Sequence, residues 1–108
     1  MGQFIPNVSE EDVERILNRE FPAEQHAEIK KLIANVTVQE KSRVVIACIK
    51  NANNDYSKLV NELENANGYW REIISEAEYP KIKKARNLTD DEINEKRKEQ
   101  YLLWFNKK

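Results

Sequence analysis

The stretch that decides the fold is Arg43–Lys50, which reads RVVIACIK and places six apolar residues in succession. β-Branched residues dominate this run, so a buried strand is one interpretation. We predict a helix instead, because the preceding Gln39–Lys41 favours helices and the chain offers no convincing partner strand. A helix that is apolar on all sides must be surrounded by other elements. The sequence therefore predicts a buried central helix near residues 38–50.

The residues before this run predict two helices. Ser9–Asp12 has the residue types and spacing of a capping box, in which two side chains satisfy free N–H groups of the first turn. The helix that it begins ends at Pro22, and a second helix is expected over residues 22–35. Thr37–Glu40 repeats the capping-box spacing ahead of the central helix.

The residues after this run predict two more helices. Asn51–Asn54 is expected to form a loop, and Asp55 to cap a long fourth helix that ends before Pro80. Glycine disfavours helix by about 1 kcal/mol relative to alanine, so we expect a bend or close packing at Gly68. Thr89–Glu92 has the spacing of another capping box, at the start of the last helix.

These elements predict an all-α fold: a single helical domain over residues 1–108, built as a bundle of about five helices. Residues 1–8 are expected to form an N-terminal extension, and residues 81–88 a basic connector. The 18 Lys and Arg against 19 Asp and Glu give a formal net charge of −1, which makes non-specific nucleic-acid binding an unfavoured function. We find neither a signal-peptide pattern nor a membrane-spanning run, so we expect a cytoplasmic protein.

Few residues are candidates for catalysis or metal binding. His26 is the only histidine, and a metal site on a bundle needs several ligands, so we favour a solvated surface residue. Cys48 lies inside the apolar run and is expected to be a core thiol. Glu72, Glu76 and Glu78 offer paired carboxylates, for which an exposed acidic face is the favoured interpretation. We therefore expect no enzyme activity, no metal and no cofactor.

A basic cluster follows the fourth helix and is a candidate anion-binding site. Its residues are Tyr79, Lys81, Lys83, Lys84 and Arg86. The cluster could hold a phosphate or a nucleic-acid backbone, with the tyrosine ring stacking on it. The acidic residues 90–92 could equally neutralise these charges within the molecule, and basic residues just past a helix C-terminus also complement the helix dipole.

The last helix ends in an apolar run, Tyr101–Phe105, which reads YLLWF. At 100° per residue these side chains point all around the helix, so a single packing neighbour cannot cover them. Either the run is sandwiched between elements, or part of it binds a partner or a second copy of the chain. Tyr101, Trp104 and Phe105 are the candidate residues of such a surface.

Two motifs together resemble a pattern found in small bacterial proteins of unknown function. In that pattern an Arg-Val-x-x-Ala-x-x-Lys helix, here Arg43–Lys50, precedes a long helix that closes in Ala-Glu-Tyr-Pro, here Ala77–Pro80. An aromatic-rich C-terminal helix follows, to which Tyr101 and Trp104 correspond. The resemblance implies a bacterial source and an all-helical domain, and it transfers no catalytic residue.

Three functional hypotheses follow from the sequence. The first is a non-enzymatic protein–protein interaction module that binds an unidentified protein partner or itself. The second is a small nucleic-acid or phosphate-binding module that uses the basic cluster, whose binding would weaken steeply with salt. The third is a bacterial immunity or antitoxin protein, in keeping with the small size and slightly acidic charge balance.

Overall fold

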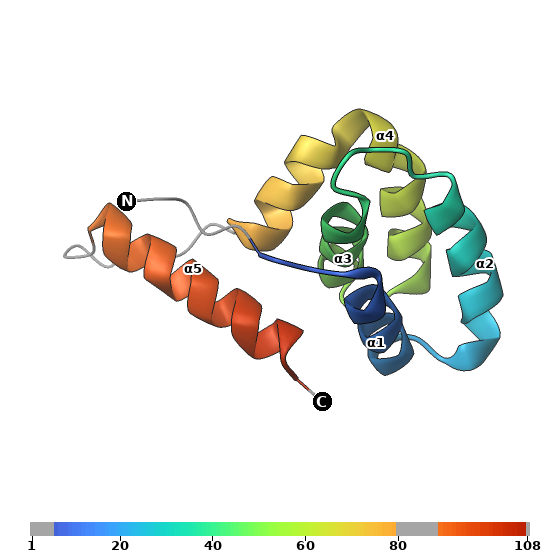
Figure 1. The fold of residues 1–108 in the computed structure, drawn as a ribbon, viewed down its shortest axis with the longest axis horizontal. Coiled ribbons are helices and arrows are strands. Elements are labelled where there is room, and N and C mark those ends of the chain that lie inside the picture. The colour runs from blue at the N-terminus through green and yellow to red at the C-terminus, as the bar shows by residue number, and fades with distance from the viewer. Residues whose placement is uncertain (1–5, 80–88, 108) are drawn as a thin grey trace.

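The computed structural model describes residues 6–79 and 89–107, and the all-α fold is confirmed for them. Over these ranges the helices are α1 (Glu10–Glu20), α2 (Ala23–Ala34), α3 (Lys41–Ala52), α4 (Tyr56–Glu78) and α5 (Asp90–Phe105) (Figure 1). Helix α3 packs mainly against α4 and next against α1, while α2 and α5 each pack against α4. Figure 1 shows α1–α4 gathered together, with α5 extending away from them.

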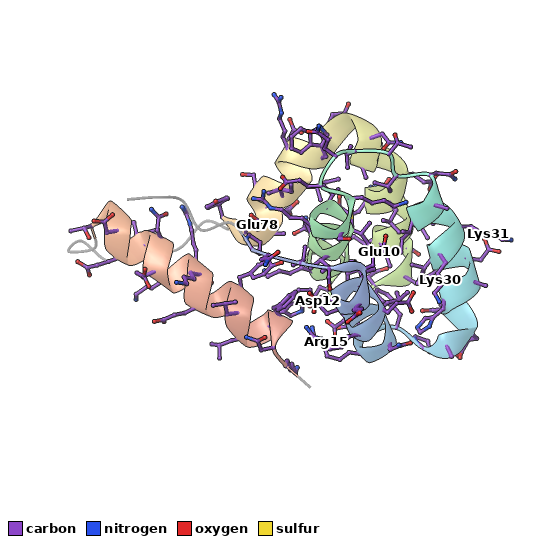
Figure 2. All side chains as sticks on the ribbon, in the orientation of Figure 1. Glu10, Asp12, Arg15, Lys30, Lys31 and Glu78 are labelled. Carbon is purple, nitrogen blue, oxygen red and sulfur yellow. The ribbon has the colours of Figure 1, made fainter. Side chains whose placement is uncertain are left out.

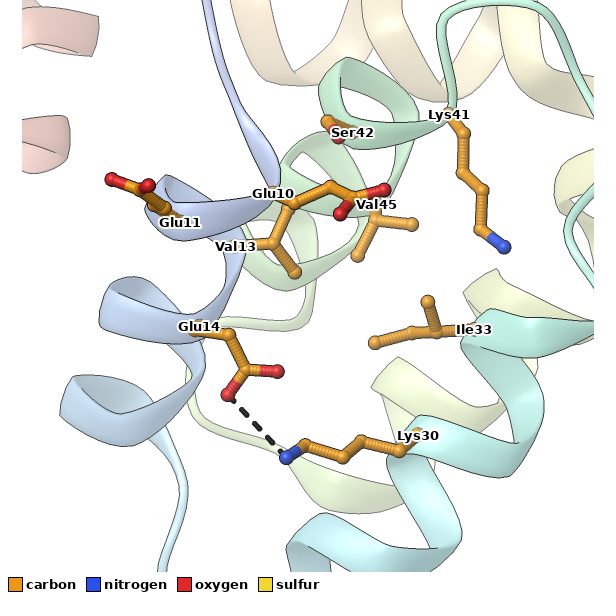
Figure 3. A pocket seen from close by; sticks show the side chains of 9 residues that line it. All are labelled: Glu10, Glu11, Val13, Glu14, Lys30, Ile33, Lys41, Ser42 and Val45. Carbon is orange, nitrogen blue, oxygen red and sulfur yellow. Dashed lines mark ion pairs between the residues drawn. The ribbon is translucent and has the colours of Figure 1, made fainter.

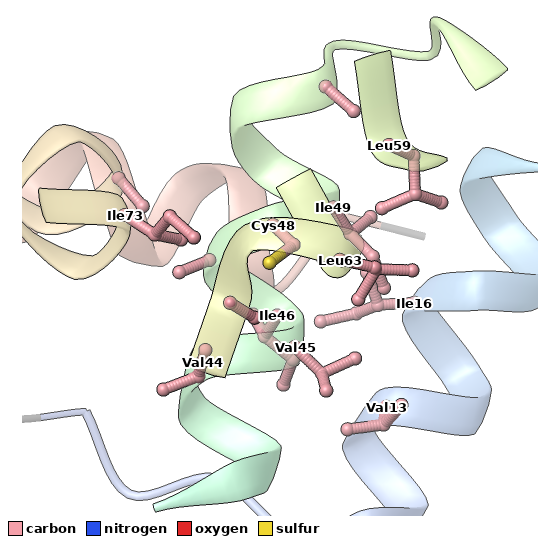
Figure 4. Packing of buried hydrophobic residues seen from close by; sticks show 14 of the residues in the cluster. Val13, Ile16, Val44, Val45, Ile46, Cys48, Ile49, Leu59, Leu63 and Ile73 are labelled. Atoms are coloured by element: carbon pink, nitrogen blue, oxygen red, sulfur yellow. The ribbon is translucent and has the colours of Figure 1, made fainter. Parts of the chain in front are cut away.

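The apolar run of α3 forms the centre of the core, as predicted. Every residue from Val44 to Ile49 is at most 1% exposed to solvent. Figure 4 shows the Cys48 side chain within this cluster, which also contains the α4 residues Leu63 and Ile73. Full burial of one such aliphatic side chain stabilises a fold by roughly 1.5–3 kcal/mol. Because α3 presents apolar residues on all sides, its neighbours assemble around it.

Three predicted N-terminal caps are confirmed. The Ser9 hydroxyl accepts from the Asp12 N–H at 3.2 Å, and the Asp12 carboxylate accepts from the Ser9 N–H at 3.0 Å, which completes the capping box of α1. The Asp55 carboxylate accepts from the N–H three residues on and so caps α4. At α5, the Thr89 hydroxyl accepts from the Glu92 N–H at 3.2 Å.

The predicted cap over Thr37–Glu40 is wrong. Glu40 precedes α3 without a side-chain cap, and the helix begins at Lys41. The Thr37 N–H donates instead to the Asn67 Oδ1 at 2.8 Å, and the Asn67 amide donates to the Asn35 carbonyl at 2.9 Å. The Thr37 N–H, which the predicted box would have paired with the Glu40 carboxylate, therefore binds an amide of α4 instead.

Helix α4 bends next to its glycine, as expected. Tyr69 has non-helical dihedral angles, with φ −121° and ψ 24°. A Cβ placed on Gly68 would meet nothing within 4 Å, so the glycine marks the bend and not a close contact. The bend lets both halves of α4 lie against α3 (Figure 1).

The predicted loop after α3 is shorter than expected, since the helix continues through Ala52 and the left-handed turn begins at Asn53.

The ends of the predicted domain are described only in part. Pro6 is buried, and the residues from there to Ser9 are not helical. The predicted connector over residues 81–88 lies outside the described residues. Among the helices in the described ranges, none combines the length and the apolar character that a bilayer crossing requires.

Candidate interaction surface

The inner face of α5 belongs to the core. Tyr101 is only 2% exposed, so its predicted place on a partner surface is wrong. Its ring stacks on that of Phe105, with centroids 5.8 Å apart, and meets the Trp104 ring edge-on at 6.1 Å. Aromatic pairs of this geometry add about 0.5–1.5 kcal/mol beyond their burial. Three aromatic residues of one helix therefore form a single packed cluster.

Helix α1 holds this aromatic cluster through two arginines. The Arg15 guanidinium carbon lies 5.0 Å from the centroid of the Phe105 ring, and that of Arg19 lies 5.0 Å from the Trp104 ring. The Trp104 indole N–H also donates to the Glu20 carboxylate at 3.2 Å. Figure 2 shows Arg15 on the side of α1 that faces α5. The predicted surface residues Trp104 and Phe105 are thus half-buried against α1.

Arg19 also fixes the C-terminal end of α5. Its Nη1 donates to the Phe105 carbonyl at 3.3 Å and to the Lys107 carbonyl at 2.6 Å. The last carbonyls of a helix lack partners within the helix and carry partial negative charge. The Arg19 guanidinium satisfies one of them, the Phe105 carbonyl, and its charge complements the helix dipole.

A buried ion pair joins the start of α3 to the end of α4. Arg43 donates from Nε and Nη2 to the two Glu78 carboxylate oxygens, at 2.7 and 2.6 Å, and from Nη1 to Glu40 at 3.0 Å. The Glu78 side chain is fully buried, so its predicted place on an exposed acidic face is wrong. Glu72 and Glu76 are exposed, as that interpretation expects. Glu78 differs because the fold brings it a bidentate arginine from 35 positions away.

Two tyrosines lie close to this ion pair. Burial raises the pKa of the Tyr101 phenol, the Glu78 carboxylate raises it further, and the Arg43 charge opposes both. Burial and Glu78 raise the pKa of Tyr79 in the same way. The guanidinium carbon of Arg97 lies 5.9 Å from the Tyr79 ring centroid, so α5 reaches the end of α4 here as well. The ion pair and the aromatic cluster are therefore adjacent parts of one structural unit.

The outer face of α5 carries an exposed apolar hollow. Leu103 is 76% exposed, the most of any large apolar residue in the described ranges, and Tyr69 at 60% is the other one that is exposed. The hollow has a volume of about 580 Å³, and we call it the α5 patch. Its residues are Glu99, Leu102, Leu103, Asn106 and Lys107. A carboxylate at one end and an ammonium at the other thus border two leucines.

The candidate anion site is described only at one residue. Tyr79 is half-buried and lies beneath Arg97. Lys81, Lys83, Lys84 and Arg86 lie outside the described residues. The anion-binding hypothesis therefore stays a prediction.

The residues considered for catalysis have structural contacts. The His26 Nε2 lies 2.7 Å from the Phe21 carbonyl oxygen, so this half-buried ring joins the start of α2 to the end of α1. Cys48 is buried as predicted, and burial raises the pKa of its thiol to about 12. Burial also lowers the pKa of the Lys50 ammonium. Within residues 6–79 and 89–107, no three His, Cys, Asp or Glu side chains are placed to hold a metal ion.

A second cavity, which the sequence analysis missed, opens between α1, α2 and the start of α3. Its volume is about 410 Å³. Figure 3 shows its lining residues, which are Glu10, Glu11, Val13, Glu14, Lys30, Ile33, Lys41, Ser42 and Val45. Lys30 pairs with Glu14 across it at 3.4 Å, and both side chains are about half exposed. Because three helices each contribute a few residues, no local motif could have revealed it.

The α5 patch is the more distinctive of the two, since it combines an exposed leucine with a helix that is fixed from behind. Sequence reasoning found the run that contains it but not which face is free. Comparisons with known protein families, with curated proteins and with solved structures found no match.

Proposed function

We propose that this protein is a non-enzymatic protein–protein interaction module whose binding surface is the α5 patch. The observation that carries the proposal is the 76% exposure of Leu103, on a helix whose opposite face holds the buried Tyr101. An exposed apolar patch with a polar rim is typical of a protein interaction site. Glu99, Asn106 and Lys107 supply such a rim around the two leucines.

The rigid support of the patch favours this proposal. Arg15 and Arg19 hold the opposite face of α5, and Arg19 binds the carbonyls at its C-terminal end. A surface that is already ordered loses little conformational entropy on binding. The patch is therefore prepared to bind a partner without rearrangement of α5.

The chemistry of the reactive side chains also favours a binding role over an enzymatic one. Cys48 is held as a neutral thiol in the core, where it cannot act as a nucleophile near neutral pH. The Glu78 carboxylate is saturated by Arg43 in a bidentate pair. His26 binds a backbone carbonyl at the end of α1. Each of these groups contributes to the fold.

The proposed partner is engaged weakly or transiently, because the patch is small. Interfaces that bury less than about 1,200 Å² in total are typical of such encounters. The alternative of a bacterial immunity or antitoxin protein stays a prediction from the sequence.

Site-specific photo-crosslinking tests the proposal. We would place a photoreactive phenylalanine analogue at position 103, irradiate living cells that express the full chain, and look for covalent protein adducts. The matched control places the analogue at position 69, the other exposed large apolar site. We expect adducts from position 103 and fewer from position 69. Equal yields at both positions, or no adduct from 103, would contradict the proposal.

A further inference from the structure

We propose that the partner of the α5 patch is a second copy of this chain, bound with the two α5 helices antiparallel across a two-fold axis near Leu103. This inference rests on the proposed function and specifies it. Two-fold dimers are the commonest soluble assemblies, and their interface uses one self-complementary patch on both copies. The α5 patches of the two copies therefore have to be complementary to each other in shape and charge.

The charges of the patch are arranged for such a match. Glu99 and Lys107 each lie four positions from Leu103, on opposite sides of it. At 1.5 Å per residue Glu99 is offset from Leu103 by about 6 Å along α5, and Lys107 lies on the other side of Leu103, just beyond the end of the helix. In an antiparallel pair centred on Leu103, Glu99 of one copy faces Lys107 of the other, and the symmetry repeats this contact. A parallel pair would instead place like charges together.

Both charged side chains are available for this contact. Neither Glu99 nor Lys107 forms an ion pair with any residue in the described ranges. Both are exposed, while the backbone carbonyl of Lys107 is held by Arg19. The Lys107 backbone is thus fixed by Arg19, while the Lys107 ammonium can contact a partner.

The apolar centre of the patch matches itself in the same arrangement. An axis near Leu103 brings the two Leu103 side chains into contact, with Leu102 at the edge of each. This contact removes from water the most exposed large apolar side chain that the structure describes. The small area predicts a dissociation constant of roughly 0.1–1 mM, in the range of weak encounters.

Sedimentation equilibrium of the full chain tests the inference, over concentrations from about 10 μM to about 1 mM. We expect wild type to dimerise and Leu103→Glu to weaken dimerisation at least tenfold. Glu99→Lys alone and Lys107→Glu alone should each weaken it about fivefold, because each places like charges together twice. An equimolar mixture of these two variants should dimerise as wild type does, since the heterodimer restores both opposite-charge contacts.

Glu64→Lys is the matched control for Glu99→Lys, because it makes the same change in net charge at an exposed site on α4. It should leave dimerisation unchanged. Three results would overturn the inference: a wild type that stays monomeric at about 1 mM, a dimer that is insensitive to Leu103→Glu, or a mixture no tighter than either charge variant alone. If the pure protein is monomeric while position 103 crosslinks to a different protein in cells, the second copy is excluded and the interaction module stands.

Discussion

Helices α3 and α5 each contain a run of five or six apolar residues, but the run in α3 is fully buried and the run in α5 only partly. In α3 every residue of Val44–Ile49 is buried. In α5 the exposed fraction ranges from 2% at Tyr101 to 76% at Leu103, two positions further along. Helix α3 has neighbours around it, whereas the residues that the structure describes cover α5 from one side only.

The comparison shows that apolar character alone does not decide burial. The orientation of α5 follows from its aromatic rings, because Trp104 and Phe105 offer faces that the arginines of α1 can cover. Leucine offers no such electrostatic contact, and Leu103 is left on the free side. A run that is apolar on all sides is thus fully buried in α3 and partly exposed in α5.

The largest effect is expected at the ion pair that joins α3 to α4. Arg43→Ala leaves the Glu78 carboxylate buried without its partner and should cost about 3–5 kcal/mol in the free energy of unfolding. The double variant Arg43→Met with Glu78→Leu should lose much less, since it buries no charge. Urea unfolding followed by tryptophan fluorescence measures both. A single-variant loss below about 1 kcal/mol would show that the pair is not essential.

The same truncation in the two runs should have very different effects. Ile46→Ala in α3 creates a cavity and should cost about 2–5 kcal/mol. Leu103→Ala in α5 should change stability by less than about 0.5 kcal/mol, because the side chain is already in water. Both values come from urea unfolding at low protein concentration, where association does not contribute. Equal losses would remove the distinction between the two helices.

Alkaline pH should weaken the core through Cys48. Burial raises the thiol pKa from 9.0 to about 12, so the unfolded chain releases this proton at lower pH than the folded one. The stabilisation is present below about pH 9 and is lost as the pH rises toward 12, by roughly 1.4 kcal/mol at pH 10. Cys48→Ala should show a shallower loss of stability between pH 8 and pH 10 than wild type. Parallel curves would contradict this origin.

A smaller effect is expected where α1 holds α5. Arg19→Ala removes one ring contact with α5 and two hydrogen bonds, to the last carbonyl of α5 and to the Lys107 carbonyl just beyond it, and should cost about 1–2 kcal/mol. Arg15→Ala is the matched control, because its contact with α5 is the Phe105 ring alone, and it should cost about half as much. In a Trp70→Phe background, acrylamide should quench Trp104 more strongly in Arg19→Ala than in Arg15→Ala. The reverse order would argue against the role of the carbonyl contacts.

Much of the fold follows from local sequence. The periodicity and the caps at Ser9, Asp55 and Thr89 act within one helical turn, so they can be read without knowledge of tertiary contacts. The buried run of α3 is equally direct, because a helix apolar on all sides has no other stable place. The prediction failed at Thr37, whose partner is an amide of α4.

The candidate site could be predicted only in part. The sequence showed that one neighbour could not cover residues 101–105, but not which residues would stay free. That choice depends on Arg15 and Arg19, which lie more than 80 positions away in the chain. The burial of Glu78 depends in the same way on Arg43. Such pairings between distant residues leave no periodic signal in a single sequence.

Native-state hydrogen exchange of the wild-type chain tests the central contrast most directly. The amides of Val44–Ile49 in α3 should exchange only through global unfolding, with the highest protection in the molecule. The amides of residues 99–105 in α5 should exchange through a local opening of lower free energy, since the face of that helix around Leu103 is exposed. Equal protection of the two helices, or faster exchange in α3 than in α5, would contradict the claim that α3 is fully buried while α5 presents an exposed binding face.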